Sequence, residues 1–168
     1  YMEIMPCNAI FLSTGTTSLA FAKTLVRKNT SGLTVITNSL TVASALFRSK
    51  CKVILLGGEL RSTSLDLVGH IGERNIEDFH VDWLISGCDG AFPNFGFYTS
   101  DSSLSNLEKM SMKIAEHVAV ITDSSKFGRR SLARFAAVRD VDLLVTDKKL
   151  ADNDRNILEN ANIKVITV

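Results

Sequence analysis

Seven short apolar segments recur along the chain, and their alternation with helix-like stretches constrains the fold more than any other feature. Each segment is four to six residues long, is rich in Val, Ile and Leu, and scarcely alternates with polar residues. Strands of a sheet that is covered on both faces have this pattern. The predicted strands are Ala9–Leu12, Leu33–Ile36, Lys52–Leu56, Asp82–Ser86, Val118–Thr122, Asp142–Thr146 and Ile163–Val168.

Helical patterns lie between these segments, with apolar residues such as Leu19, Ala22 and Leu25 on one face. Strands that alternate with helices predict an α/β fold with a mostly parallel sheet flanked by helices. The length of 168 residues is that of one domain. The predicted helices are Ser18–Lys28, Thr41–Ser49, Ser103–His117 and a last helix that Asp154 caps and that runs to Asn160.

Charge and cysteine usage narrow the class of protein. The net charge of +1 creates no field that would draw this chain onto nucleic acid or an acidic membrane. No apolar run approaches the roughly 20 residues of a membrane-spanning helix. The three cysteines form no CxxC pair, which favours a reducing cytoplasm over a disulfide framework or a zinc site. The histidines are too scattered to predict a metal site. The cysteines are Cys7, Cys51 and Cys88, and the histidines are His70, His80 and His117.

Small, hydroxylated or charged residues follow nearly every predicted strand. Ligands of open α/β sheets bind outside the carboxyl ends of the strands, so these loops form the candidate site. A glycine lets backbone N–H groups approach an anion, hydroxyls donate further hydrogen bonds, and the next helix presents its positive end. The segments are Ser13–Thr17, Thr37–Ser39, Gly57–Gly58, Gly87–Gly90, Asp123–Lys126 and Asp147.

Two of these turns, residues 13–17 and 37–39, are expected at one edge of the sheet, where Lys126 would add a full positive charge. Their convergence favours a phosphate or carboxylate ligand. The alternative for a single turn is that its hydroxyls only cap the next helix, at about 1 kcal/mol each. Gly57–Gly58 can equally be a turn that needs positive φ. Neither standard nucleotide-binding motif, GxGxxG or GxxxxGK[ST], is present.

Six stretches, taken in order, resemble the C-terminal sensor domain of DeoR-type bacterial transcription regulators. They are "IFLSTGTTSLAFA", "LTVITNSLTVASAL", "VILLGGELRSTSLDLVG", "VDWLISGCDGAFPNFGFYT", "ITDSSKFGRRSLARFAAV" and "VDLLVTD". The resemblance covers nearly the whole chain. It implies an α/β fold related to ribose-5-phosphate isomerase and a sensor of phosphorylated sugars or similar small anionic metabolites, without a cofactor or a metal.

The same resemblance implies an N-terminal winged helix-turn-helix that binds operator DNA and precedes residue 1. Tyr1–Met5 reads as the end of a helix, so we expect the chain to be part of a longer protein, a cytoplasmic repressor of a carbohydrate operon. A symmetric homo-oligomer is expected, because a regulator that reads a repeated operator needs one.

Carried over by position, the resemblance places the phosphate, the sugar and a late Asp…Lys pair on separate segments. The phosphate-side turns contain Ser13, Thr14, Gly15, Thr16, Thr17, Thr37, Asn38 and Ser39. The glycine pair at the edge of the pocket is Gly57 and Gly58. The loop that faces the sugar contains Asp89, Gly90 and Gly96, and the late Asp…Lys pair is Asp123 and Lys126.

The sequence departs from the family pattern at two places. The first turn usually carries Asp where Ser13 stands, and the loss of that carboxylate should ease binding of an anion. The helix after Gly96 usually carries a Glu-Ala pair and then a Lys, whereas this chain has Leu104–Glu108 there. Glu108 would oppose an anion if its side chain faces the pocket.

Two other classes of function are weighed against a sensor. In an isomerase, Asp89 or Asp123 would act as the base and Lys126 would stabilise the enediolate. A module that only forms oligomers would bind no ligand. A loop is expected around Pro93 and Gly96, and its aromatic residues could belong to the core, to an interface or to a lid; they are Phe92, Phe95, Phe97 and Tyr98.

Overall fold

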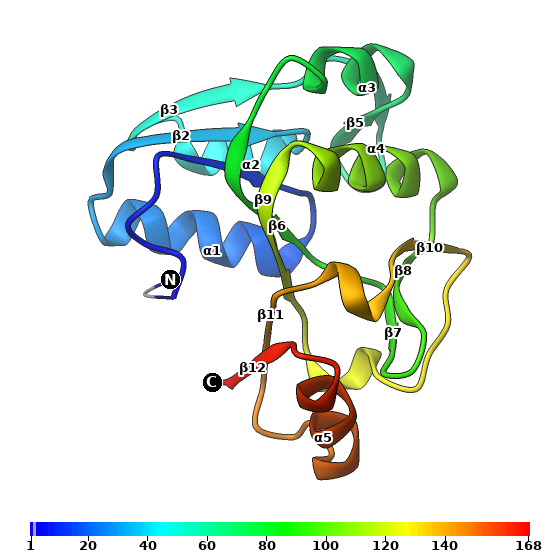
Figure 1. Cartoon of the computed structure of the whole chain (residues 1–168). Coiled ribbons are helices and arrows are strands. Elements are labelled where there is room, and N and C mark those ends of the chain that lie inside the picture. The colour runs from blue at the N-terminus through cyan, green and yellow to red at the C-terminus, as the bar shows by residue number, and fades with distance from the viewer. Residues whose placement is uncertain (2) are drawn as a thin grey trace.

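A seven-stranded parallel sheet forms the centre of the computed structural model, which describes residues 1 and 3–168 (Figure 1). The strand order is β12-β11-β9-β6-β1-β2-β3. All seven predicted strands are present, so the predicted α/β fold with a mostly parallel sheet is confirmed. The strands are β1 (Ala9–Leu12), β2 (Ser31–Thr37), β3 (Lys50–Leu55), β6 (Val81–Ser86), β9 (Ala115–Ile121), β11 (Leu143–Thr146) and β12 (Lys164–Thr167).

Helices cover both faces of this sheet. Successive residues of a strand point to opposite faces, and in β1 the side chains of Ile10 and Leu12 pack in one hydrophobic cluster while Phe11 packs in another. The first cluster includes residues of α1 (Thr16–Arg27) and α2 (Leu40–Leu46). The second includes residues of α3 (His70–Ile76), α4 (Ser102–Lys113) and α5 (Asp152–Asn160).

Several predicted helix bounds were wrong. The helix predicted over Ser18–Lys28 begins at Thr16, and the one predicted over Thr41–Ser49 ends at Leu46. The helix predicted over Ser103–His117 ends at Lys113, because Ala115–Ile121 forms β9 between β6 and β11. The last helix begins at Asp152, with Ala151 at the N-cap position and no side-chain cap. Asp154 therefore lies within the first turn, where a carboxylate still interacts favourably with the helix dipole.

Two small antiparallel sheets extend from the main one. The first pairs β4 (Glu59–Arg61) with β5 (Asp66–Val68), and the second has the order β10-β8-β7. Two single-turn 3₁₀ helices, η1 and η2, complete the chain. The bounds are β7 (Gly90–Phe92), β8 (Gly96–Thr99), β10 (Ala133–Ala136), η1 (Ser124–Lys126) and η2 (Val138–Asp140).

The aromatic segment around Pro93 is a β-hairpin, formed by β7 and β8. Phe97 is buried in the core cluster of α4. The Arg130 guanidinium lies over the rings of Phe92 and Phe95, 4.8 and 4.4 Å from their centroids. The segment therefore contributes both to the core and to a cation–π contact at the surface.

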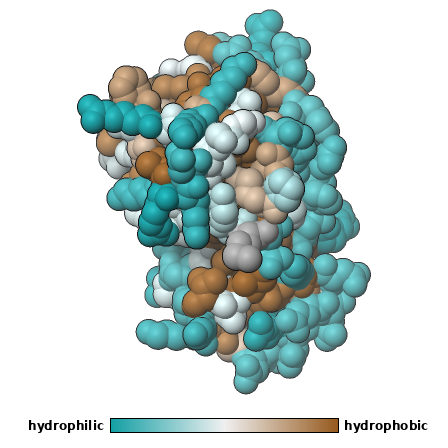
Figure 2. Space-filling model, turned by 90° about the vertical axis from the view of Figure 1, so that its left-hand side faces the viewer, coloured by the Kyte–Doolittle hydropathy of each residue, from teal (hydrophilic) through white to brown (hydrophobic). Residues whose placement is uncertain are grey.

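Hydrophobic side chains also reach the surface. On the face seen in Figure 2 they form separate areas with hydrophilic side chains between them. Among the described residues, Phe47 and Leu132 are the most exposed large hydrophobic residues, at 84% and 76%. Within the described residues, no helix is long and apolar enough to cross a membrane.

Gly96 illustrates how closely the second small sheet is packed. Its φ is +135°, and a Cβ atom at this position would lie 2.0 Å from the carbonyl oxygen of Ala136 in β10. A methyl group at this position would therefore push β8 and β10 apart.

We expect Gly96→Ala to lower the free energy of unfolding by about 2 kcal/mol or more, from backbone strain and overpacking together. Gly128→Ala is the matched control, because Gly128 also has positive φ (+73°) but faces open space. Urea denaturation of the two variants measures the difference. Equal losses would contradict the close approach of β8 and β10.

Candidate functional site

A pocket of about 570 Å³ lies at the carboxyl ends of β1, β6 and β9. β2, which follows β1 along the chain, pairs with it on one side, and β6 pairs with it on the other side. The order of strands thus reverses beside β1, and ligands of open α/β sheets bind at such a point. The loops that follow all three strands line the pocket, with Thr14, Cys88 and Thr122 among the lining residues.

The N-terminus of α1 forms one wall of the pocket. Thr14, Gly15, Thr16, Thr17 and Ser18 line it. Gly15 occupies the N-cap position with φ +120°, and no side chain caps the first turn. The first N–H groups of a helix have no partner inside the helix, so these amides and the positive end of the helix face the pocket. No acidic residue lies in this first turn.

Lys126 supplies a full positive charge to the same pocket. It ends η1 after β9 and lines the cavity. No carboxylate lies within 4.0 Å of its ammonium group in the described part of the chain. The amides of α1 and this ammonium group therefore give the pocket a positive side.

Asp123 and Asp89 also line the pocket, and local hydrogen bonds engage one oxygen atom of each carboxylate. Asp123 accepts from the backbone N–H of Ser125 at 3.1 Å and from its hydroxyl. The Ser125 hydroxyl is the main reason why the pKa of Asp123 is lowered. Asp89 accepts from the backbone N–H and the hydroxyl of Ser100, at 2.7 and 2.8 Å. Both carboxylates therefore fix the backbone around the pocket.

Glu108 lies in the wall formed by α4. It is only 3% exposed, and Leu104, one turn earlier on the same face, also lines the pocket. The Ser13 hydroxyl donates to Oε1 of Glu108, while Oε2 has no hydrogen-bond partner. Burial raises the pKa of Glu108 to about 7, against the opposing effects of the Ser13 and Ser86 hydroxyls. The two positions that depart from the family pattern thus contact each other, and Glu108 faces the pocket.

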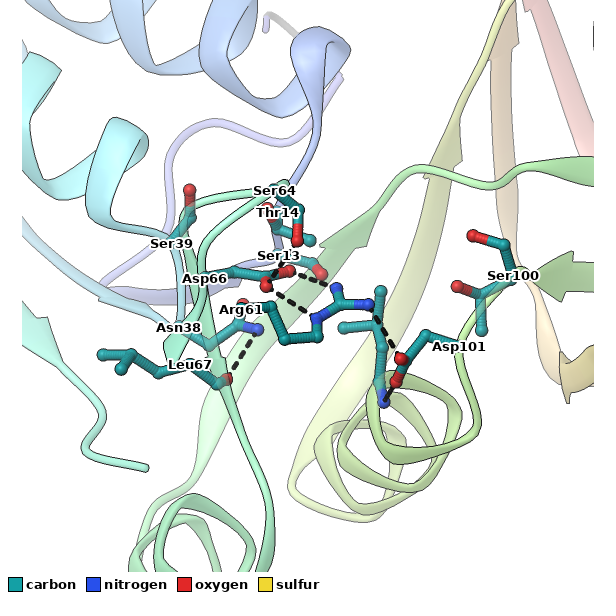
Figure 3. Close-up of polar contacts among 12 residues, drawn as sticks. Ser13, Thr14, Asn38, Ser39, Arg61, Ser64, Asp66, Leu67, Ser100 and Asp101 are labelled. Atoms are coloured by element: carbon teal, nitrogen blue, oxygen red, sulfur yellow. Dashed lines mark hydrogen bonds and ion pairs between the residues drawn. The ribbon is translucent and has the colours of Figure 1, made fainter. Parts of the chain in front are cut away.

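Arg61 joins the first small sheet to α4 at another wall of the pocket (Figure 3). Its Nε donates to Oδ1 of the buried Asp66 at 2.8 Å. Its Nη1 lies 3.1 Å from Oδ2 of Asp101. Asp101 caps α4 by accepting from the N–H of Leu104 at 2.8 Å. This N–H is the main reason why the pKa of Asp101 is lowered, and Arg61 adds to it.

The second predicted turn does not line the pocket. Thr37, Asn38 and Ser39 are fully buried beneath β4 and β5. The N–H of Leu67 donates to the carbonyl of Asn38 at 2.8 Å, and Asn38 Nδ2 donates to the carbonyl of Leu67 at 3.1 Å. Ser39 caps α2 by accepting from the N–H of Val42. These polar groups support a covering hairpin, and only Thr41 of the next turn reaches the pocket.

Five further predicted residues lie outside the cavity. Ser13 is buried behind it against Glu108. The glycines allow close packing of backbone and side chains: Cβ atoms at Gly58 and Gly90 would lie 2.5 and 2.4 Å from the carbonyl oxygens of Val68 and Arg129. Gly57 packs against Ile71, and Gly96 against β10, as described above.

Sequence reasoning missed several lining residues. Arg61, Thr63 and Ser64 come from the hairpin of β4 and β5, Thr99 is the last residue of β8, and Ser100 follows it. None of them directly follows a strand of the main sheet, whereas the predicted site residues came from loops after such strands. The one available signal was the polar stretch "ELRSTSLD" beside the glycine pair. No group of three potential metal ligands occurs among the described residues.

Comparison with known proteins places the chain in a family. The model of the DeoR C terminal sensor domain matches residues 2–148, and the chain belongs to this family. It is 29% identical over 164 residues to the HTH-type transcriptional regulator GlpR of Haloferax volcanii, covering 98% of this chain. It is 31% identical over 141 residues to the glycerol-3-phosphate regulon repressor of Escherichia coli K12, covering 83% of this chain. The chain spans 64% and 55% of the lengths of these two relatives.

Solved structures confirm the predicted ribose-5-phosphate-isomerase-like fold. Ribose 5-phosphate isomerase A of Neisseria gonorrhoeae matches with a TM-score of 0.54 at 19% identity, over 76% of this chain and 49% of its own. The eIF2B beta subunit of Chaetomium thermophilum matches with a TM-score of 0.56 at 16% identity, over 95% of this chain and 50% of its own. At such identities the likeness concerns the fold alone.

The buried carboxyl of Glu108 makes stability depend on pH. Burial raises its pKa from 4.5 to about 7, so the folded state holds this proton more tightly than the unfolded chain does. The stability gained is fully present below pH 4.5 and is lost as the pH rises to about 7. We expect Glu108→Gln to be more stable than the wild type by roughly 3 kcal/mol at pH 8, and nearly equal to it at pH 4. Urea denaturation across this range measures the difference. A difference that does not grow with pH would show that Glu108 is ionised as easily as an exposed carboxyl.

Proposed function

We propose that this chain is the effector-sensing domain of a DeoR-type transcriptional regulator, and that it binds a phosphorylated sugar or a similar small anionic metabolite. The observation that carries the proposal is the uncapped N-terminus of α1, which faces the same pocket as the ammonium group of Lys126. Helix N-termini are ready-made phosphate sites, because their N–H groups and dipole both favour negative charge.

The remainder of the pocket suits the carbon chain of such a ligand. Its volume of about 570 Å³ lies in the range of small-molecule sites, roughly 300–1,000 Å³. Hydroxyl groups from three separate segments could bond to ligand hydroxyls; they belong to Thr16, Thr17, Ser64, Thr99 and Ser100. The name of one relative, the glycerol-3-phosphate regulon repressor, supports a phosphorylated polyol as a probe.

The whole regulator, in this proposal, is a cytoplasmic homo-oligomeric repressor of a carbohydrate operon. A winged helix-turn-helix before residue 1 contacts operator DNA, which agrees with the nearly neutral charge of this chain. The effector acts by favouring one arrangement of domains or subunits, since equal affinity for both arrangements would shift nothing. The named relatives are transcriptional regulators, which supports this assignment.

The sensor assignment also implies that the chain is not an enzyme. Each of the two carboxylates considered as bases, Asp89 and Asp123, accepts local hydrogen bonds through one of its oxygen atoms, and these bonds fix the backbone. We expect no conversion of ribose 5-phosphate to ribulose 5-phosphate when the chain is incubated with it at pH 7.5. A colorimetric ketose assay measures this, and turnover above the uncatalysed rate would replace the sensor by an isomerase.

Lys126 provides the direct test of the anion site. We expect Lys126→Ala to weaken binding of sulfate, glycerol 3-phosphate and ribose 5-phosphate by about tenfold or more, because a hydrogen bond to a charged group contributes about 1.5–3 kcal/mol. Lys148→Ala is the matched control, since Lys148 is exposed and lies outside this pocket. Titration calorimetry and ligand-induced thermal shifts both measure the effect. Affinity unchanged in Lys126→Ala would remove this residue from the site, and failure of all three probes to bind the wild type would remove the anion site itself.

A further inference from the structure

Glu108 is a buried acid without a positive partner. The Ser13 hydroxyl donates to Oε1 of its carboxyl. The Ser86 hydroxyl donates to the carbonyl of Gly87 at 3.0 Å and also lies close enough to the carboxyl to lower its pKa. Oε2 is buried and has no hydrogen-bond partner of good geometry in the described part of the chain. An unpaired buried polar atom in a native structure calls for an explanation, such as a ligand or a water molecule that completes it.

The position of Glu108 connects it to the anion site. Ser13, its hydrogen-bond partner, directly precedes the turn that leads into the uncapped N-terminus of α1. Glu108 and this turn line the same cavity from α4 and from α1. An anion on the first turn of α1 would therefore share the cavity with this carboxyl.

We propose that Glu108 determines which ligands the pocket accepts. As a neutral carboxyl it permits an anion at the N-terminus of α1 and offers Oε2 to a hydroxyl group of the ligand. As a carboxylate it repels the anion. The inference rests on the proposed anion site and extends it. It assigns the ligand class as a phosphorylated polyol or sugar with a hydroxyl group near the phosphate.

The surroundings of Glu108 favour its neutral form. From β5, the carboxylate of Asp66 opposes ionisation of Glu108, although Arg61 pairs with Asp66. The strand-end loops contribute Asp89 and Asp123, and η1 contributes Lys126. The first turn of α1 contains no acidic residue. The cavity thus offers Glu108 no cation in direct contact, in the part of the chain that the structure describes.

Few other groups in the cavity change charge near neutral pH. Burial raises the pKa of Cys88 to about 11, and hydrogen bonding lowers the pKa of Asp123. None of the described lining residues is a histidine. Burial places the pKa of Glu108 at about 7. Affinity for an anion should therefore fall between pH 6 and pH 8.5 as Glu108 ionises, and by reciprocity anion binding should take up a proton.

Sulfate is the probe that isolates this effect, because it remains a dianion throughout this pH range. We expect the affinity of the wild-type chain for sulfate to fall roughly tenfold from pH 6 to pH 8.5, the effect of one unit charge on a dianion about 6 Å away at the dielectric constant of water. Glu108→Gln should keep its affinity over the same range. Glu116→Gln is the matched control: Glu116 is exposed on β9, pairs with His80 and lies outside the pocket, so this variant should follow the wild type.

Ser13→Ala tests the contact itself. The Ser13 hydroxyl lowers the pKa of Glu108 by stabilising the carboxylate. Its removal should move the midpoint of the sulfate profile to higher pH without abolishing binding at pH 6. A purely structural role of Ser13 would reduce affinity at every pH alike.

The role of Oε2 is tested with glycerol 3-phosphate against sulfate at pH 6. Glu108→Leu should lose about tenfold in affinity for glycerol 3-phosphate, the effect of one hydrogen bond, and keep its affinity for sulfate. Equal losses for both probes, or a sulfate affinity of the wild type that does not change with pH, would overturn the inference while leaving the anion site intact. Failure of sulfate to bind at any pH would overturn the proposed function, and this inference with it.

Discussion

The parallel pairing of β1 with both β2 and β6 is the constraint on which the site depends. Parallel strands all present their carboxyl ends at one edge of the sheet, and each must be followed by a crossover. The crossover after β1 runs through α1 toward β2, whereas β6 lies on the opposite side. The connections that follow β1 and β6 therefore diverge, and the space between them is the pocket. Small residues at Thr14, Gly15 and Gly87 keep that space open.

Helix capping decides which of the strand-end turns can bind a ligand. The turn before α1 has no side-chain cap, so the amides of the first helical turn are left for the pocket. The turn before α2 looks similar in sequence, yet Ser39 caps its own helix and Asn38 bonds to β5. The difference comes from the hairpin of β4 and β5, which covers one turn and leaves the other open. The same residue types therefore leave helix amides open to a pocket in one place and support the fold in the other.

The main sheet could be predicted from the sequence because buried parallel strands are continuous apolar runs, as in Leu33–Ile36 and Val118–Thr122. The small sheets could not, since strands of three or four residues such as Glu59–Arg61 have no clear periodicity. The end of α4 was missed because Ala115–His117 fits either a helix or a strand until its neighbours are known. Arg61 and Ser64 reach the pocket only through these short strands, and the contact between Ser13 and Glu108 joins residues 95 positions apart. Local patterns do not contain such pairings.

The two walls of the pocket belong to different halves of the hydrophobic interior. α1 is anchored in the cluster on one face of the sheet, and α4 is anchored in the cluster on the other face. A small molecule that contacts both helices therefore adds a bridge between the two layers, beside the hydrogen bond from Ser13 to Glu108 and the hairpin of β4 and β5. Tightening of that bridge would change the separation of α1 and α4 across the sheet edge, and with it the relative placement of surfaces on opposite sides of the domain.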